Sequence, residues 1–133
     1  MRMIFVNLPV KDLTAAKKFF TELSFEFNPE FSDDTAACMI VDQNIFVMLL
    51  VEERFRDFIN GEISDATKTT EVLTCLSADS RKHVDETIAK AIAAGGQPWK
   101  PTLEEGPMYG GSFQDLDGHV WELLYMEQQE RQQ

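Results

Sequence analysis

Hydrophobic and polar residues follow two different periods along the chain. Residues 3–10 (MIFVNLPV) are rich in apolar and β-prone types, which predicts a strand. The period then changes to that of a helix, with Leu13, Ala16 and Phe20 on one face and Asp12 placed to cap the N-terminus. Three more strands are predicted after this helix, at residues 26–31, 36–41 and 45–52.

The same order of elements occurs a second time. Residues 71–76 read as a strand, and residues 80–94 read as a helix with Val84, Ile88 and Ala91 on one face. Two consecutive glycines end this helix. Three further strands are predicted at residues 97–102, 110–114 and 119–126.

This doubled order predicts an α+β fold made of two βαβββ repeats. We expect them to form one curved mixed sheet around a cleft, with the helices outside, and such a cleft is the default place for a ligand. The chain is predicted to be a single domain, 1–133. Its expected parts are repeat one at about 1–52, a linker at 53–69, repeat two at about 70–126 and a frayed tail at 127–133.

Composition and charge narrow the function classes. The chain has 133 residues, with 12 basic and 23 acidic ones, giving a formal net charge of −11. An acidic chain repels phosphate backbones, so nucleic-acid partners are not expected. No apolar run approaches the roughly 18 residues that span a membrane, and no polybasic segment offers a membrane contact. With no cleavable signal pattern at the N-terminus, the expected location is the cytoplasm.

Two segments carry a resemblance to a known family. VKDLTAAKKFF near the start and FQDLDGHVWEL near the end, in this doubled order, resemble the vicinal oxygen chelate superfamily. That superfamily includes glyoxalase I, the fosfomycin and bleomycin resistance proteins and the extradiol dioxygenases. More closely, FVNLPVKDL, CMIVDQNIFVMLL, MYGGSF and DLDGHVWE are similar to a bacterial group labelled predicted lactoylglutathione lyase.

The resemblance implies a divalent metal (Zn, Ni, Mn or Fe) held by one residue from the first and last strands of each half. Carried over to this chain, the four positions fall on Phe5, Leu49, Leu73 and Glu122. Only Glu122 has a side chain that binds such a metal. We therefore expect no cofactor, and no metal in the usual positions.

Glu122 is the main candidate for chemistry. It lies in the apolar run HVWELLYM, and strand alternation places Val120, Glu122 and Leu124 on one face. A carboxylate among such neighbours is costly unless it is paired. It is therefore either a functional group that acts on a ligand, or a relic of the family paired with a nearby donor.

Other residues are weaker candidates for binding a ligand. Asn7 either donates to a ligand or bonds its own backbone. Tyr109 precedes Gly110 and Gly111, which permit a bulge or a close backbone approach. Tyr109 itself either contacts a ligand at the mouth of the cleft or packs over the turn. Met39 and Phe5 are expected to line an adaptable apolar pocket. A displaced metal site would need Glu71 and Cys75 together with Asn7 and Glu122. The predicted ligand-binding residues are thus Asn7, Phe5, Leu49, Leu73, Tyr109 and Met39.

The sequence leaves three functions open. The first is a small-molecule-binding protein with a degenerate metal site, similar to the bleomycin resistance proteins. The second is a lactoylglutathione lyase-like or dioxygenase-like enzyme that uses Glu122 with a relocated divalent metal. The third is a ligand-responsive partner protein without chemistry. In each case we expect a homodimer, because two such repeats leave sheet edges that natural proteins cover.

Overall fold

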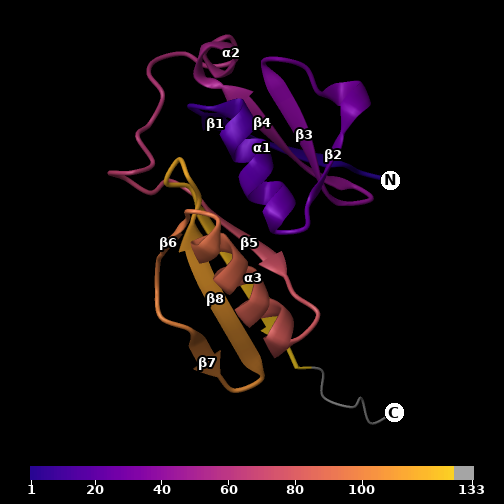
Figure 1. Cartoon of the computed structure of the whole chain (residues 1–133), viewed down its shortest axis with the longest axis vertical. Coiled ribbons are helices and arrows are strands. Elements are labelled where there is room, and N and C mark those ends of the chain that lie inside the picture. Colours follow the sequence, from indigo (N-terminus) through magenta and orange to yellow (C-terminus); the bar gives the residue numbers. More distant parts are fainter. Residues whose placement is uncertain (128–133) are drawn as a thin grey trace. The chain divides into compact units, whose positions relative to one another are not determined.

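The computed structural model describes residues 1–127 and divides into two compact units. The first unit spans Met1–Asp65 and the second begins at Ala66. Figure 1 shows that each unit combines a sheet with one long helix. Apart from Glu127, the predicted tail at 127–133 lies outside the described residues.

The first unit follows the predicted order closely. The Asp12 carboxylate accepts a hydrogen bond from the backbone N–H of Ala15 at 3.0 Å, which confirms the predicted helix cap. Pro29 and the Asn28 cap turn the end of the predicted strand at 26–31 into a short 3₁₀ helix. The elements are β1 (Ile4–Val10), α1 (Leu13–Glu22), β2 (Glu26–Asn28), η1 (Pro29–Phe31), β3 (Ala36–Asp42), β4 (Ile45–Val51) and α2 (Glu52–Arg56).

The strands of the first unit form a four-stranded sheet in the order β1-β4-β3-β2. β1 runs parallel to β4, and the other pairs are antiparallel. α1 contacts β3 and β4 and covers one face of this sheet. The core of the unit lies between α1 and that face. Its buried side chains include Val10, Leu13, Ala16, Phe19, Phe20, Ala37, Met39, Val47 and Leu49.

The second unit repeats this plan with one difference at the edge of its sheet. The predicted strand at 97–102 is reduced to two residues, and a further short strand that the sequence did not predict follows it. Both pair with the same neighbour, so together they act as one interrupted edge strand. The elements are β5 (Leu73–Ser77), α3 (Arg81–Ala93), β6 (Gln97–Pro98), β7 (Leu103–Glu105), β8 (Met108–Gln114) and β9 (Val120–Met126).

The strands of the second unit pair in the order β5-β9-β8-β6, with β7 also on β8. β5 is parallel to β9, as β1 is to β4, and this correspondence confirms the two repeats. Hydrogen bonding divides the strands between two sheets, one per unit. The predicted α+β class and its two βαβββ repeats are confirmed.

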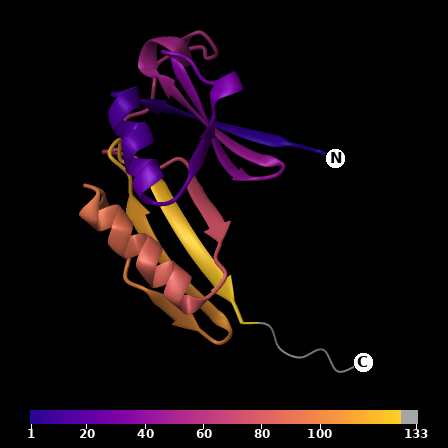
Figure 2. The ribbon, with the colours of Figure 1, turned by 45° about the vertical axis from the view of Figure 1, so that its right-hand side comes forward.

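Gly111 explains how closely α3 approaches the sheet of the second unit. A Cβ at this position would lie 2.9 Å from the Ile88 side chain and 3.1 Å from that of Val84, both on α3. The glycine predicted to allow a close backbone approach therefore does so, and α3 packs along β8 and β9 (Figure 2). The opposite face of this sheet carries no helix of the second unit among the described residues.

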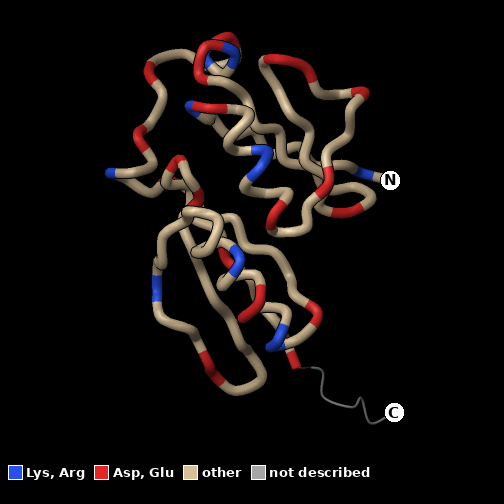
Figure 3. The backbone as a smooth tube through the Cα atoms, viewed as in Figure 1, with Lys and Arg blue, Asp and Glu red and all other residues tan. Residues whose placement is uncertain are grey.

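Acidic residues are spread over both units instead of gathering on one element (Figure 3). No helix among residues 1–127 is long and apolar enough to cross a membrane.

Candidate functional site

The candidate site lies on the sheet face of the second unit that is opposite α3. Cys75 on β5 pairs in register with Glu122 on β9, and Glu122 pairs with Ser112 on β8. The three polar side chains therefore form one row across three neighbouring strands. On the same face, Val120 and Leu124 flank Glu122 along β9, and Leu73 and Ser77 flank Cys75 along β5. We call this surface the Glu122 face; it consists of Leu73, Cys75, Ser112, Val120, Glu122 and Leu124.

Glu122 has no protein partner on this face. Its side chain is half-buried, and within residues 1–127 no ion pair or side-chain hydrogen bond reaches its carboxylate. Val120 and Leu124 flank it along β9, as strand alternation predicts. The expected alternative, a family relic paired with a nearby donor, finds no such donor in the described part of the chain.

Cys75 lies directly beside this carboxylate. Burial raises the pKa of the Cys75 thiol, and the negative charge of Glu122 raises it further. Both effects disfavour the thiolate, which is the form that attacks electrophiles and binds metals. At neutral pH the row therefore carries one charge, that of Glu122.

Ser112 is the last residue of the row and lies on β8 between the parts that pair with β6 and β7. Its side chain is buried, and its hydroxyl accepts a hydrogen bond from the backbone N–H of Lys100 at 3.0 Å. This contact holds the chain where the edge strand is interrupted between β6 and β7. Ser112 therefore fixes the edge of the Glu122 face.

The first unit has a corresponding row. Asn7 on β1 pairs with Met48 on β4, and Met48 pairs with Cys38 on β3, in the same strand order as the row of the second unit. Met48 is thus the counterpart of Glu122. We call the surface around this row the Asn7 face; it consists of Phe5, Asn7, Cys38, Phe46, Met48 and Leu50.

This register corrects the predicted positions of Leu49 and Met39. Both side chains are on the face covered by α1 and are fully buried, with 0% of their surface exposed. If the metal-ligand position implied by the resemblance lies on the same face as Asn7, it falls on Met48 and not on Leu49, because a shift of one residue moves a strand side chain to the opposite face. Met39 likewise is part of the core and lines no open pocket.

Phe5 and Asn7 do lie together on the Asn7 face. The Phe5 ring stacks on its register partner Phe46, with ring centroids 5.0 Å apart and planes 14° apart. The Asn7 amide donates a hydrogen bond to the backbone carbonyl of Phe5 at 3.1 Å. This is the local backbone contact named as the alternative for Asn7, and it leaves the amide oxygen for other donors.

Tyr109 lies on the opposite face from Glu122. Side chains alternate between the two faces along β8, and Ser112, the register partner of Glu122, is three residues after Tyr109. Its hydroxyl donates to the Asp85 carboxylate at 2.6 Å, and the Arg81 guanidinium lies 5.0 Å from its ring centre. The hydrogen bond to Asp85 is the main reason why the pKa of Tyr109 is raised. Tyr109 therefore joins β8 to α3 on the face opposite to Glu122, and its expected contact with a ligand at the mouth of the cleft stays a prediction.

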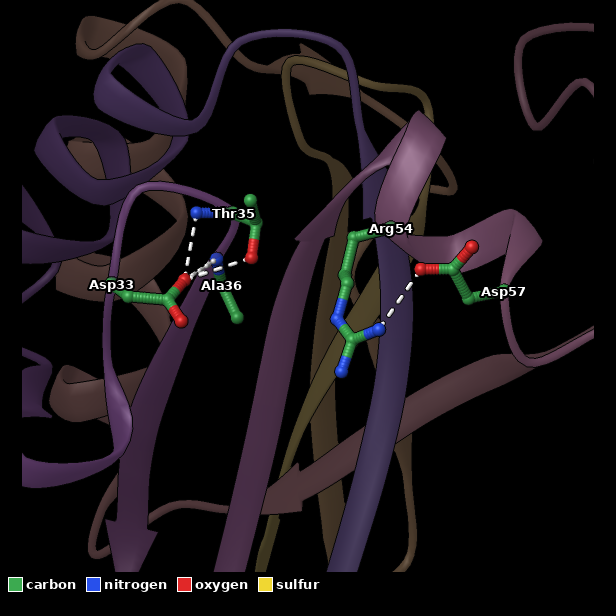
Figure 4. A network of polar contacts seen from close by, with 5 residues as sticks. All are labelled: Asp33, Thr35, Ala36, Arg54 and Asp57. Atoms are coloured by element: carbon green, nitrogen blue, oxygen red, sulfur yellow. Dashed lines mark hydrogen bonds and ion pairs between the residues drawn. The ribbon is translucent and has the colours of Figure 1, made fainter.

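Asp33 holds one turn near these faces, and Asp115 holds another. Asp33 accepts hydrogen bonds from the backbone N–H and the hydroxyl of Thr35 and from the backbone N–H of Ala36, which lower the pKa of its carboxyl (Figure 4). The nearby pair Arg54–Asp57 at 2.9 Å joins one end of α2 to the residue that follows it. The contacts of Asp33 shape the loop that leads into β3.

Asp115 holds the turn that leads into β9. Its buried carboxylate accepts hydrogen bonds from the backbone N–H groups of Asp117 and His119 and from the Trp121 indole at 3.0 Å. Burial raises its pKa, although these donors act in the other direction. The turn thereby positions the start of the strand that carries Glu122.

The residues present do not fit the metal that the family resemblance implies. With the register corrected, the four positions hold Phe5, Met48, Leu73 and Glu122. A phenyl ring and an isobutyl group have no lone pairs to donate, and a thioether is a weak, uncharged donor. Within residues 1–127, no group of three or more His, Cys, Asp or Glu side chains is arranged to hold a metal.

Some of these features were missed from the sequence. Sequence patterning does not single out Met48 or Ser112, because periodicity describes one strand at a time. The signal that would have found them was the pairing across the two hairpins, which places them in one row with Asn7 and Glu122 respectively.

Comparisons with known proteins agree with this architecture. Residues 2–42 match a family model described as bleomycin resistance protein-like N-terminal. No curated protein matches the chain. Among solved structures, the chain is similar to hypothetical protein SA1046 from S. aureus, with a TM-score of 0.79 and 26% identity over 94% of each chain.

Two further solved structures share the fold at lower identity. One is a glyoxalase/bleomycin resistance protein/dioxygenase family enzyme from Burkholderia phytofirmans PsJN, with a TM-score of 0.77 and 16% identity over 95% of this chain and 99% of that one. The other is the fosfomycin resistance protein FosX from Listeria monocytogenes, complexed with Mn(II) and sulfate. It has a TM-score of 0.69 and 19% identity over 93% of this chain and 89% of that one. The family match and these neighbours fit the vicinal oxygen chelate superfamily, as the sequence resemblance predicts.

Proposed function

We propose that this chain is a glyoxalase-like protein that binds a small, partly apolar molecule without a metal in the usual positions. The observation that carries the proposal is which residues occupy the four metal-ligand positions implied by the resemblance. Phe5, Met48 and Leu73 stand in three of them, and only Glu122 is a residue that binds such a metal. A single carboxylate does not hold a borderline divalent ion against water and cellular chelators. The fold is retained, so the surface that it displays is available for another ligand.

The Glu122 face supports binding of such a molecule. Leu73 is 51% exposed, and Cys75 beside it is exposed as a neutral thiol. An apolar surface with one fixed polar group is typical of small-molecule sites. The proposal keeps Leu73 as a contact for the ligand on this face. It keeps Phe5 and Asn7 as contacts on the Asn7 face.

One experiment tests both the proposed function and its rival, a metalloenzyme with a relocated metal. The protein is purified without chelators, its metal content is measured, and Mn, Ni, Zn and Fe are then added during a ligand screen by NMR. We expect less than one metal per chain, and we expect ligands that shift the amide signals of Cys75 and Glu122 in the metal-free protein. A stoichiometric ion that is lost in Glu122→Gln would refute the proposal and favour the enzyme.

We also propose that the protein is a cytoplasmic homodimer. β1 and β5 each form one end of a sheet, and both carry exposed apolar side chains, such as Phe5 at 47% and Leu73 at 51%. Unpaired edges of this kind are normally covered in native proteins, and a second copy is the commonest cover. Sedimentation that shows only monomer at micromolar concentration would contradict this part of the proposal.

A further inference from the structure

The charge distribution of the second unit is unusually simple at its centre. Glu122 is the one charged residue in the strands β5, β8 and β9. The interrupted edge strand adds Glu104 and Glu105 and no basic residue. The sheet that carries the Glu122 face therefore presents negative charge only.

Arg81 and Lys100 contact the sheet of the second unit, but neither pairs its charged group with Glu122. The Arg81 guanidinium is paired with Glu104 and lies over the ring of Tyr109, on the side of the sheet that faces α3. Lys100 contacts the Glu122 face through its backbone, by the hydrogen bond to Ser112. Its ammonium forms no ion pair with Glu122.

A half-buried carboxylate among apolar neighbours is unfavourable without a counter-ion. The protein supplies none within the described residues, and the donor set does not fit a divalent metal. A positively charged ligand removes this imbalance. Because the Cys75 thiol is held neutral, the face carries a single negative charge and matches a single positive one.

We propose that the Glu122 face binds a small organic cation, with Glu122 as the counter-ion of a protonated nitrogen and Leu73 and Leu124 contacting its apolar part. This inference rests on the proposed function and adds the charge of the ligand to it. It also excludes anionic substrates from this face, because their charge would meet Glu122 and a chain with a net charge of −11.

Three probes of equal shape and different charge test the proposal: benzylammonium, benzyl alcohol and benzoate. Each is titrated into the isotope-labelled full chain, and amide shifts are followed by NMR. We expect benzylammonium to shift the amides of Cys75, Ser112 and Glu122, and to bind about tenfold more tightly than benzyl alcohol, the ratio typical of one charge-assisted hydrogen bond. Benzoate should not bind. Added salt should weaken the binding of benzylammonium alone.

Two variants complete the experiment. Glu122→Gln keeps the shape of the side chain and should reduce the affinity for benzylammonium to that for benzyl alcohol. Glu105→Gln removes an equal charge from the edge of the same sheet and should leave the affinity nearly unchanged. If Glu122→Gln does not fold, the comparison of the three probes on the wild-type chain decides the question without it.

The outcomes separate this inference from the proposed function. If benzyl alcohol and benzylammonium shift the same amides with equal affinity, the face binds ligands but the assignment of a cation is wrong. Binding of benzoate at this face would also overturn the assignment. If none of the probes shifts these amides at millimolar concentration, both the cation site and the proposed ligand site are refuted.

Discussion

Cys75 and Glu122 are register partners on the parallel strands β5 and β9, so that a carboxylate lies beside a thiol and helps it to keep its proton. Their counterparts in the first unit, Asn7 and Met48, carry no charge. The two repeats thus keep one geometry and differ in chemistry. Of these two rows, only the one in the second unit contains an acidic side chain, and its effect can be measured through the thiol of Cys75.

Replacing Glu122 by Gln should lower the pKa of the Cys75 thiol. Burial is the larger cause of the raised pKa and remains in the variant, so the pKa should fall only part of the way to its usual value. The measurement is the rate of alkylation by iodoacetamide at several pH values, with the modified residue identified by mass spectrometry. The buried Cys38 should stay unreactive in both proteins. An unchanged rate at Cys75 would mean that the two side chains do not interact.

The raised pKa of Cys75 also predicts how stability depends on pH. The folded chain holds this proton more tightly than the unfolded chain, whose thiol has a pKa of about 8.5. The contribution of Cys75 to stability is therefore complete below that value and is lost as the pH rises through the folded pKa. Urea unfolding of the wild-type chain and of Cys75→Ser on either side of this range should show a steeper alkaline loss in the wild type. Parallel losses would contradict the prediction.

Asp115→Asn should destabilise the chain by about 2–3 kcal/mol, because a neutral amide cannot accept from all three donors that the carboxylate satisfies. The Trp121 indole, buried in the core, would then face an N–H₂ group. Urea unfolding measures the loss. The exposed Asp34→Asn removes the same charge and should change stability by less than about 0.5 kcal/mol. Equal effects of the two substitutions would show that charge, and not hydrogen bonding, is responsible.

Gly118→Ala should be more damaging than Gly61→Ala, although both residues have a positive φ. A Cβ on Gly118 would lie 2.9 Å from the backbone of Ala66 and Thr67, whereas a Cβ on Gly61 would meet nothing within 4 Å. Gly61→Ala should cost about 1 kcal/mol from backbone strain alone, and Gly118→Ala should cost more than that. Thermal unfolding of both variants checks the difference.

Leu49→Ala and Met48→Ala test the corrected register with neighbouring residues. Leu49 is fully buried, so its truncation should cost about 2–5 kcal/mol in unfolding free energy. Met48 lies on the Asn7 face and is half-buried, so its truncation should cost clearly less. If Met48→Ala were the more destabilising of the two, the assignment of faces in β4 would be wrong.

The sequence by itself determined the elements and their doubling. Periodicity is a local property, so the helices around Phe20 and Val84 and most of the strands were found within a few residues of their observed ends. The Asp12 cap and the close approach at Gly111 were also local signals. Strand alternation placed Glu122 on the face that it occupies.

Only the tertiary structure decided which strands pair and in what register. Those pairings are long-range contacts: they moved the metal-ligand position from Leu49 to Met48 and sent Tyr109 to the α3 face. They also brought Cys75, Glu122 and Ser112 into one row, although β5 and β9 are separated in the chain by a helix and three strands. Hydrophobic patterning shows that a strand has a buried face, but the identity of its neighbours depends on how the whole sheet assembles.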